Sequence, residues 1–257
     1  MRKLSIVVIT LLLVLSLGQI VAAQETANIA LKLGYDKKEY HQLGSHYPNN
    51  TRTFVASAPI ISLSGEAYIY DNFSLSVASN ISFGHWNDSA DVISTPDKHP
   101  FFSISLNPSA KYTILSGNTY KAGVQLGAYG EYFTFIFSEY YTYHFTGLFI
   151  IPGIYGEIYV IPKLKLSLDA SFPIFGIFEY YESDSVEMEG SNFFNVFFYD
   201  AKLSVLYDIT PHISLGIEGV VSNTNAFALY WGVRNLSTKN NIAKPNFSIG
   251  VKVQYNF

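Results

Sequence analysis

Residues 247–257 have the sequence FSIGVKVQYNF, and apolar side chains fill every second position of this stretch. Serine, glycine, lysine, glutamine and asparagine fill the positions between them. A β-strand places successive side chains on opposite faces, whereas the 3.6-residue period of an α-helix cannot separate them in this way. The stretch therefore predicts a strand with one apolar face and one polar face.

The same alternation continues along the chain from Asn28 onward and predicts ten strands. They lie at about 27–36, 54–70, 73–85, 101–115, 119–133, 147–161, 164–178, 195–207, 212–222 and 246–257. Short connections rich in turn-forming residues, at 71–72, 116–118, 162–163 and 208–211, alternate with long ones. Short turns at one rim and long loops at the other are typical of transmembrane barrels. We expect an all-β, closed, antiparallel up-and-down transmembrane β-barrel of ten strands, with eight or twelve as alternatives.

The first residues have the three-part pattern of a secretory signal peptide. Arg2 and Lys3 precede an apolar run at 4–17, and small side chains end the segment at Ala23. The apolar run is shorter than the roughly 20 residues that a membrane-spanning helix needs. We therefore expect a cleaved signal peptide at 1–23 and a barrel at 24–257, exported to the bacterial outer membrane with its short turns toward the periplasm.

The composition excludes several classes of function. Only 14% of the residues are charged while 16% are aromatic, and the formal net charge of −4 does not favour a nucleic-acid partner. The chain has no cysteine, which rules out disulfides, thiolate nucleophiles and cysteine-ligated metals. The aromatic-rich, charge-poor balance indicates strands in contact with an apolar medium.

The charged residues within the predicted strands all share the face of the polar residues. Charge on the lipid face is costly, by about 2 to 4 kcal/mol for a cation at the bilayer midplane, so a barrel with a polar lumen requires this sorting. The six lysines and six acids that we expect inside, largely paired with one another, are Lys32, Glu66, Lys111, Lys121, Glu131, Glu157, Lys165, Asp169, Asp200, Lys202, Glu218 and Lys252.

Aromatic residues on the apolar face gather near the strand ends, where Tyr and Trp favour the membrane interface. Those near the short turns predict a girdle on the periplasmic side, formed by Phe73, Tyr112, Tyr120, Tyr207 and Tyr255. Those near the long loops predict an outer girdle, formed by Tyr35, Phe83, Tyr132, Phe172 and Tyr199.

The terminal residues Val253, Tyr255 and Phe257 resemble the C-terminal assembly signal of bacterial outer-membrane proteins. The resemblance implies that the barrel-assembly machinery is a partner during biogenesis and that outer-membrane lipids surround the protein. In size and pattern the chain is similar to the small barrels grouped with OmpA, OmpX, OmpW and opacity-type proteins, although ten strands exceed the eight typical of those.

No complete catalytic constellation is present, so we expect no catalytic residues. Omptin-like proteases also have ten strands and use acidic pairs with a His-Asp dyad at the outer rim; here His85 lies near Asp88 and Asp91, and His144 follows Glu139. Small-barrel lipid A deacylases need a His two residues before a Ser that is followed by Asn. Here Ser222 and Asn223 are present, but Val220 stands at the position of the His. Without that base the Ser222 hydroxyl would be a poor nucleophile.

We also expect no metal and no cofactor. The six histidines, at 41, 46, 85, 99, 144 and 212, show no metal-ligand spacing. The acidic segment 179–189 is interpreted as a solvated loop rather than a site for divalent cations. The aromatic segment 133–145 either extends its flanking strands into a hairpin, which the alternation favours, or folds inward to bind an apolar or sugar ligand.

Three functions remain open at this point. The first is a non-enzymatic barrel with a structural or surface-interaction role, a charge-paired lumen and long extracellular loops that meet an external ligand. The second is a narrow channel for small solutes, and the third is an outer-membrane hydrolase. A wide porin is excluded because barrels of eight to ten strands have lumens about as wide as their own side chains.

Overall fold

A computed structural model describes residues 27–43, 51–88, 99–136, 142–172, 175–182, 187–190, 200–222 and 246–257. These residues form twelve strands: β1 (Ala27–Leu43), β2 (Thr51–Tyr70), β3 (Phe73–Asp88), β4 (His99–Ser116), β5 (Tyr120–Ile136), β6 (Thr142–Ile161), β7 (Leu164–Ser171), β8 (Phe175–Glu182), β9 (Glu187–Gly190), β10 (Asp200–Asp208), β11 (Ile213–Ser222) and β12 (Asn246–Asn256). The predicted signal peptide, 1–23, lies outside the described residues and stays a prediction. Within the described part of the chain, no helix is long and apolar enough to cross a membrane.

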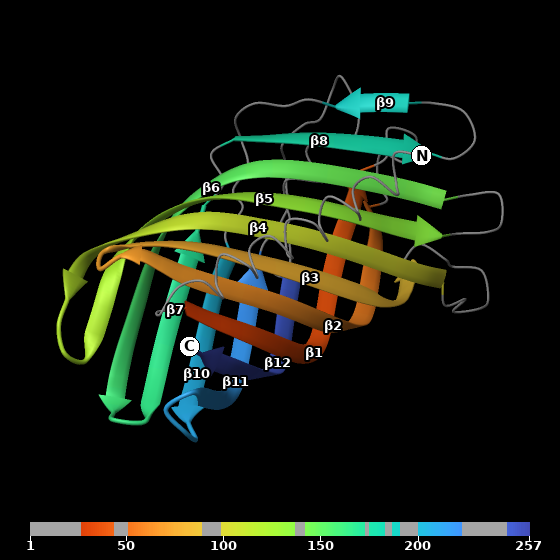
Figure 1. The fold of residues 1–257 in the computed structure, drawn as a ribbon. Helices are drawn as coiled ribbons and strands as arrows, with labels where there is room; N and C mark the ends of the chain where they lie inside the picture. The colour runs from red at the N-terminus through yellow and green to blue at the C-terminus, as the bar shows by residue number, and fades with distance from the viewer. Residues whose placement is uncertain are drawn as a thin grey trace.

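The twelve strands make a barrel with ten strand positions. β7 and β8 together occupy one position in the wall, and β9 and β10 together occupy the next. Both β7 and β8 pair with β6, β7 along its lower part from Leu164 to Ser171 and β8 beyond it from Phe175. In the same way β10 pairs with β7, while β9 pairs with β8. Pairing of β5 with β6 closes the ring (Figure 1). The prediction of a closed antiparallel ten-stranded barrel is confirmed, and the alternatives of eight and twelve are wrong.

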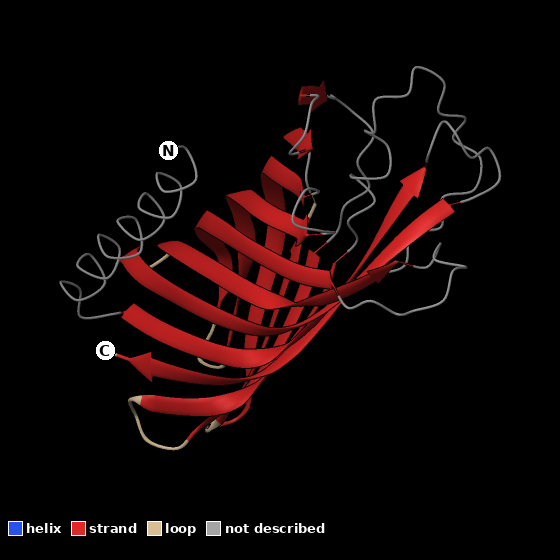
Figure 2. Cartoon of the chain, turned by 90° about the vertical axis from the view of Figure 1, so that its right-hand side faces the viewer, coloured by secondary structure: helices blue, strands red, loops and turns tan. Residues whose placement is uncertain are grey.

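The two ends of the barrel sequence meet at the rim that carries the short turns. β1 pairs with β12 from Asn28 opposite Asn256 upward, and the Phe257 amide donates a hydrogen bond of 2.9 Å to the Ala27 carbonyl. Figure 2 shows the strands wrapping obliquely around the barrel, so each one crosses the wall at a tilt, as barrel closure requires. No strand edge is left open at this seam.

The apolar faces of the strands point outward, opposite to the arrangement in a soluble barrel. On β12, Phe247, Ile249, Val251 and Val253 are exposed, whereas Ser248 and its neighbours of the same parity are buried. A soluble monomer rarely exposes so extensive an apolar surface, but a bilayer covers it. The exterior is therefore apolar, as the fold of a transmembrane barrel requires.

The strands extend beyond their predicted ends on the long-loop side. β5 and β6 remain paired as far as Ile136 and Thr142, with Phe133 opposite Phe145, so the aromatic segment 133–145 extends the hairpin; residues 137–141 lie outside the described part. The acidic segment, expected as a loop, instead contains the second half of β8 and most of β9, with Glu179 opposite Glu189. Both extensions arise because backbone pairing continues past the apolar belt that defined the predicted ends.

Candidate functional site

The candidate site is the interior of the barrel, where the polar faces of all ten strands converge. Its central cavity has a volume of about 180 Å³. Ten of the twelve predicted lumen charges line it: Lys32, Glu66, Lys111, Glu157, Lys165, Asp169, Asp200, Lys202, Glu218 and Lys252. The other two, Lys121 and Glu131, lie nearer the two ends of the lumen.

One group of charges lies at the seam formed by β1, β12 and β11. Lys32 and Lys252 occupy opposite positions in the β1–β12 register, an arrangement in which like charges repel. The carboxylate of Glu218 lies between them, 3.1 Å from the Lys32 ammonium and 2.9 Å from that of Lys252. Lys32 also donates to the Ser248 hydroxyl at 3.4 Å. A single glutamate thus makes it possible for two buried lysines to face each other.

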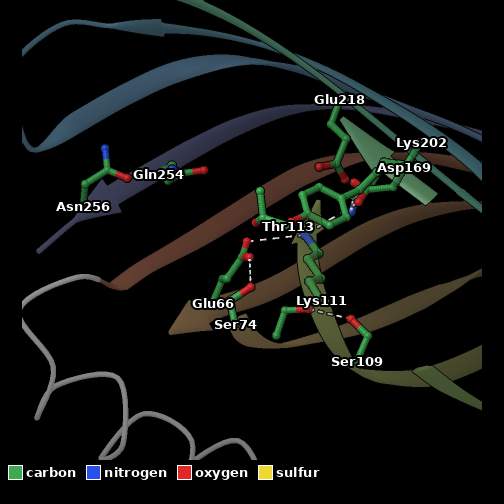
Figure 3. Close-up of polar contacts among 12 residues, drawn as sticks. Glu66, Ser74, Ser109, Lys111, Thr113, Asp169, Lys202, Glu218, Gln254 and Asn256 are labelled. Carbon is green, nitrogen blue, oxygen red and sulfur yellow. Dashed lines mark hydrogen bonds and ion pairs between the residues drawn. The ribbon is translucent and has the colours of Figure 1, made fainter. Parts of the chain in front are cut away.

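A second group runs across the lumen and joins four strands that are not all neighbours. Lys111 on β4 lies 3.4 Å from Glu66 on β2 and 3.6 Å from Asp169 on β7, and Asp169 lies 2.9 Å from Lys202 on β10 (Figure 3). Ser74 donates to Glu66 at 2.6 Å. Together with Lys32, Glu218 and Lys252 these residues form what we call the central charge layer. It connects opposite parts of the barrel wall.

A third group of charges lies closer to the long loops and includes a lysine that the sequence prediction missed. Lys38 on β1 pairs with Glu131 on β5 and lies 3.6 Å from Asp36, and it donates to Ser103 at 3.1 Å. Strand 1 was predicted to end at 36, which left Lys38 outside it. Continuing the alternation by one more step, from Asp36 to Lys38, would have placed this lysine in the lumen.

The long-loop half of the lumen also contains large apolar side chains, which the prediction of a wholly polar interior did not include. Trp86, Phe101, Phe133 and Phe149, from β3, β4, β5 and β6, have exposed fractions of 0%, 3%, 1% and 4%. They share the strand parity of the lumen residues, and Trp86 stacks on His99 with ring centroids 4.7 Å apart. We call these four residues the aromatic layer. It fills the wall of β3 to β6 with apolar side chains above the charges.

Most residues of the predicted girdles and assembly signal lie on the outer face. Tyr112, Tyr120, Tyr207 and Tyr255 are about half exposed at the short-turn rim, and Phe73, opposite Tyr112 in the register, is less exposed. Val253, Tyr255 and Phe257 are exposed, and Tyr255 meets Phe257 edge to face at 5.0 Å between centroids. Near the long loops Tyr35, Phe83 and Phe172 are exposed and Tyr132 is partly buried, while Tyr199 lies outside the described residues.

The candidate catalytic motifs are not assembled within the described residues. His85 is exposed and lies on the outward parity of β3, while Asp91 and Glu139 lie outside the described part of the chain. Ser222 shares the lumen parity of Glu218 and Val220 rather than the lipid-facing parity that a deacylase motif requires, and Asn223 is not described. Among the described residues no group of three or more His, Asp or Glu could hold a metal ion.

Comparisons with known proteins show the fold and no more. No family model matches the sequence, and no curated protein matches it. The outer-membrane protease OmpT from Escherichia coli superposes with a TM-score of 0.58 at 12% identity, covering 91% of this chain and 98% of that one. The transport unit of the autotransporter AIDA-I from Escherichia coli gives a TM-score of 0.46 at 10% identity, covering 91% of each chain. The chain therefore has the fold of bacterial outer-membrane β-barrels.

Proposed function

We propose that this protein is an integral outer-membrane barrel with a closed lumen, and that its function is structural or surface-interactive rather than catalytic. The observation that carries the proposal is the bridge from Glu66 through Lys111 and Asp169 to Lys202, which crosses the lumen. Side chains that bind each other across a narrow barrel leave no continuous path for a solute.

The aromatic layer supports the same conclusion independently. Trp86 and Phe133 are almost completely buried, and they line neither the central cavity nor the cavity at the short-turn mouth. A solute that passed the charge layer would next meet apolar side chains. Barrels of this strand number fill their interior with side chains, whereas aqueous channels are typical of 16 strands or more.

The proposed surroundings follow from the exterior. Lipids of the outer membrane would cover the apolar belt, and the barrel-assembly machinery would recognise the stripe of Val253, Tyr255 and Phe257, which lies exposed on the outside. The signal peptide at 1–23 would direct export. A rigid interior would then hold the long connections on the far rim, where we place the contact with an external ligand.

Conductance of the purified protein in planar bilayers tests the proposal. We expect no stepwise currents from the native protein. The variant K111S/D169S removes the lumen-crossing bridge but keeps the aromatic layer, so its lumen should stay closed. Adding F101S and F133S to this variant should produce stepwise currents. Steps from the native protein whose size changes in K202Q would contradict the closed barrel and favour the alternative of a narrow solute channel.

A further inference from the structure

A second cavity opens at the rim that carries the short turns, which faces the periplasm in the orientation proposed above. It has a volume of about 260 Å³. We call it the vestibule. It shares Asn28, Glu157, Lys165 and Gln254 with the central cavity, so the two are adjacent, and the central charge layer lines the central cavity beyond it. The vestibule is therefore a pocket entered from one side.

The lysines of the vestibule differ from those of the central charge layer in their partners. Lys32, Lys111, Lys202 and Lys252 each form an ion pair with a carboxylate. Within the described part of the chain, neither Lys121 nor Lys165 has a carboxylate within 4.0 Å of its ammonium.

The two lysines flank one strand from either side. Lys121 on β5 is opposite Glu157 of β6, and Lys165 on β7 is opposite Tyr159 of β6. The side chains of the pocket wall thus carry two cations and one carboxylate, a side-chain net charge of +1, and Phe257 lies at the same wall with its α-carboxylate. Partly buried cations without a carboxylate partner favour an anion from solution, because charge that no opposite charge balances is costly away from bulk water.

Neutral hydrogen-bonding groups and aromatic rings complete the lining. Asn28, Gln254 and Asn256 present amides, and Gln254 donates to Asn256 at 2.7 Å. Tyr68 contributes a ring, and the ammonium of Lys121 lies 4.7 Å from its centroid. Amides can donate to and accept from hydroxyl groups, and a ring offers an apolar face. This combination suits a hydroxylated ligand rather than an apolar one.

We propose that the vestibule binds a small hydroxylated carboxylate of the sugar-acid class, with its carboxylate between Lys121 and Lys165 and its hydroxyls on the amides. The volume suits a monosaccharide-sized molecule, since it lies just below the range of about 300 to 1,000 Å³ typical of pockets for larger ligands. Glu157 opposes the ligand charge and limits its affinity.

Titration calorimetry on the full protein purified from membranes in detergent tests this site, with glucuronate as probe and glucose as its neutral counterpart. We expect glucuronate to bind and glucose not to bind. K121Q and K165Q should each weaken glucuronate binding roughly tenfold, as loss of a charge-assisted hydrogen bond does. E157Q should strengthen binding severalfold because it removes the opposing carboxylate.

K163Q is the matched control. Lys163 lies in the exposed turn between β6 and β7, at the same rim, and does not line the vestibule. Circular dichroism and thermal unfolding would establish that each variant is folded. Equal binding of glucose and glucuronate, or glucuronate binding that K165Q leaves unchanged in a folded variant, would overturn the proposal. Neither outcome bears on whether the lumen conducts, which the bilayer experiment decides separately.

Discussion

The ammonium of Lys111 lies 3.6 Å from the carboxylate of Asp169, although the two residues come from β4 and β7, with β5 and β6 between them in the ring. Side chains on adjacent strands meet in every sheet, but this contact reaches across the interior. Asp169 also binds Lys202 at 2.9 Å, so one carboxylate serves two cations. Asp169 is therefore the carboxylate on which the bridge across the lumen depends.

Replacing Asp169 by Asn should destabilise the barrel. Lys111 would keep Glu66, but Lys202 would lose its 2.9 Å partner. Because the Lys202 side chain is 35% exposed, the loss should fall below the about 3 to 5 kcal/mol typical of a fully buried pair. Urea unfolding of refolded protein in detergent, followed by tryptophan fluorescence, measures the loss. D71N in the exposed turn between β2 and β3 is the control and should change the free energy of unfolding by less than about 0.5 kcal/mol. Equal stability of D169N and D71N would show that the bridge contributes nothing.

At the seam, Glu218 should be coupled energetically to Lys252. E218Q leaves Lys32 and Lys252 facing each other without a carboxylate, which we expect to cost about 3 kcal/mol. In E218Q/K252M only one lysine remains, so part of that loss should be recovered. A double-mutant cycle on unfolding free energies gives the coupling; additive effects would mean that Glu218 does not act by separating the two lysines.

The sequence predicted the barrel well because the face on which a residue lies depends only on its position within its own strand. Lys32, Lys252 and Glu218 could be assigned to the inner face by counting every second residue within each strand, and this period does not depend on the partner strand. Which charges meet is not local. The contact between Lys111 and Asp169 depends on the register of three intervening strand pairs and on ring closure, which no single strand encodes.

The aromatic layer escaped prediction for a related reason. Phe101 and Phe102 are adjacent, so two apolar residues in a row do not by themselves show which one faces the lumen. Tyr132 was predicted to face outward, which implies that the next residue, Phe133, faces inward, but the prediction stopped at the polar residues. In the structure Phe101 and Phe133 are the buried members of these two pairs. The sequence shows that one ring of each pair must point inward, and the parity of Ser103 and Glu131 would have identified it.

A charged residue introduced on the outer face should lower the free energy of unfolding more in the middle of the barrel wall than at its rim. Val251 is 54% exposed in the middle of β12, and Ile213 is 40% exposed at the short-turn rim of β11. If lipid covers this face, V251R should cost about 2 to 4 kcal/mol and I213R about 0 to 1 kcal/mol, because an arginine near the interface reaches water. Unfolding in lipid vesicles measures both. Equal, small penalties would indicate that lipid does not cover the exterior.

Removing the aromatic group of Phe257 should impair assembly without blocking export. Its ring contacts Tyr255, and its amide closes the seam onto Ala27. F257A retains the backbone bond but loses the ring, whereas F257Y keeps both and serves as the matched control. We expect F257A to accumulate in the periplasm, with a severalfold lower level in the outer-membrane fraction, and F257Y to reach the native level. Fractionation and immunoblotting distinguish the two, and a native level of F257A in the outer membrane would show that the terminal ring is not the recognised feature.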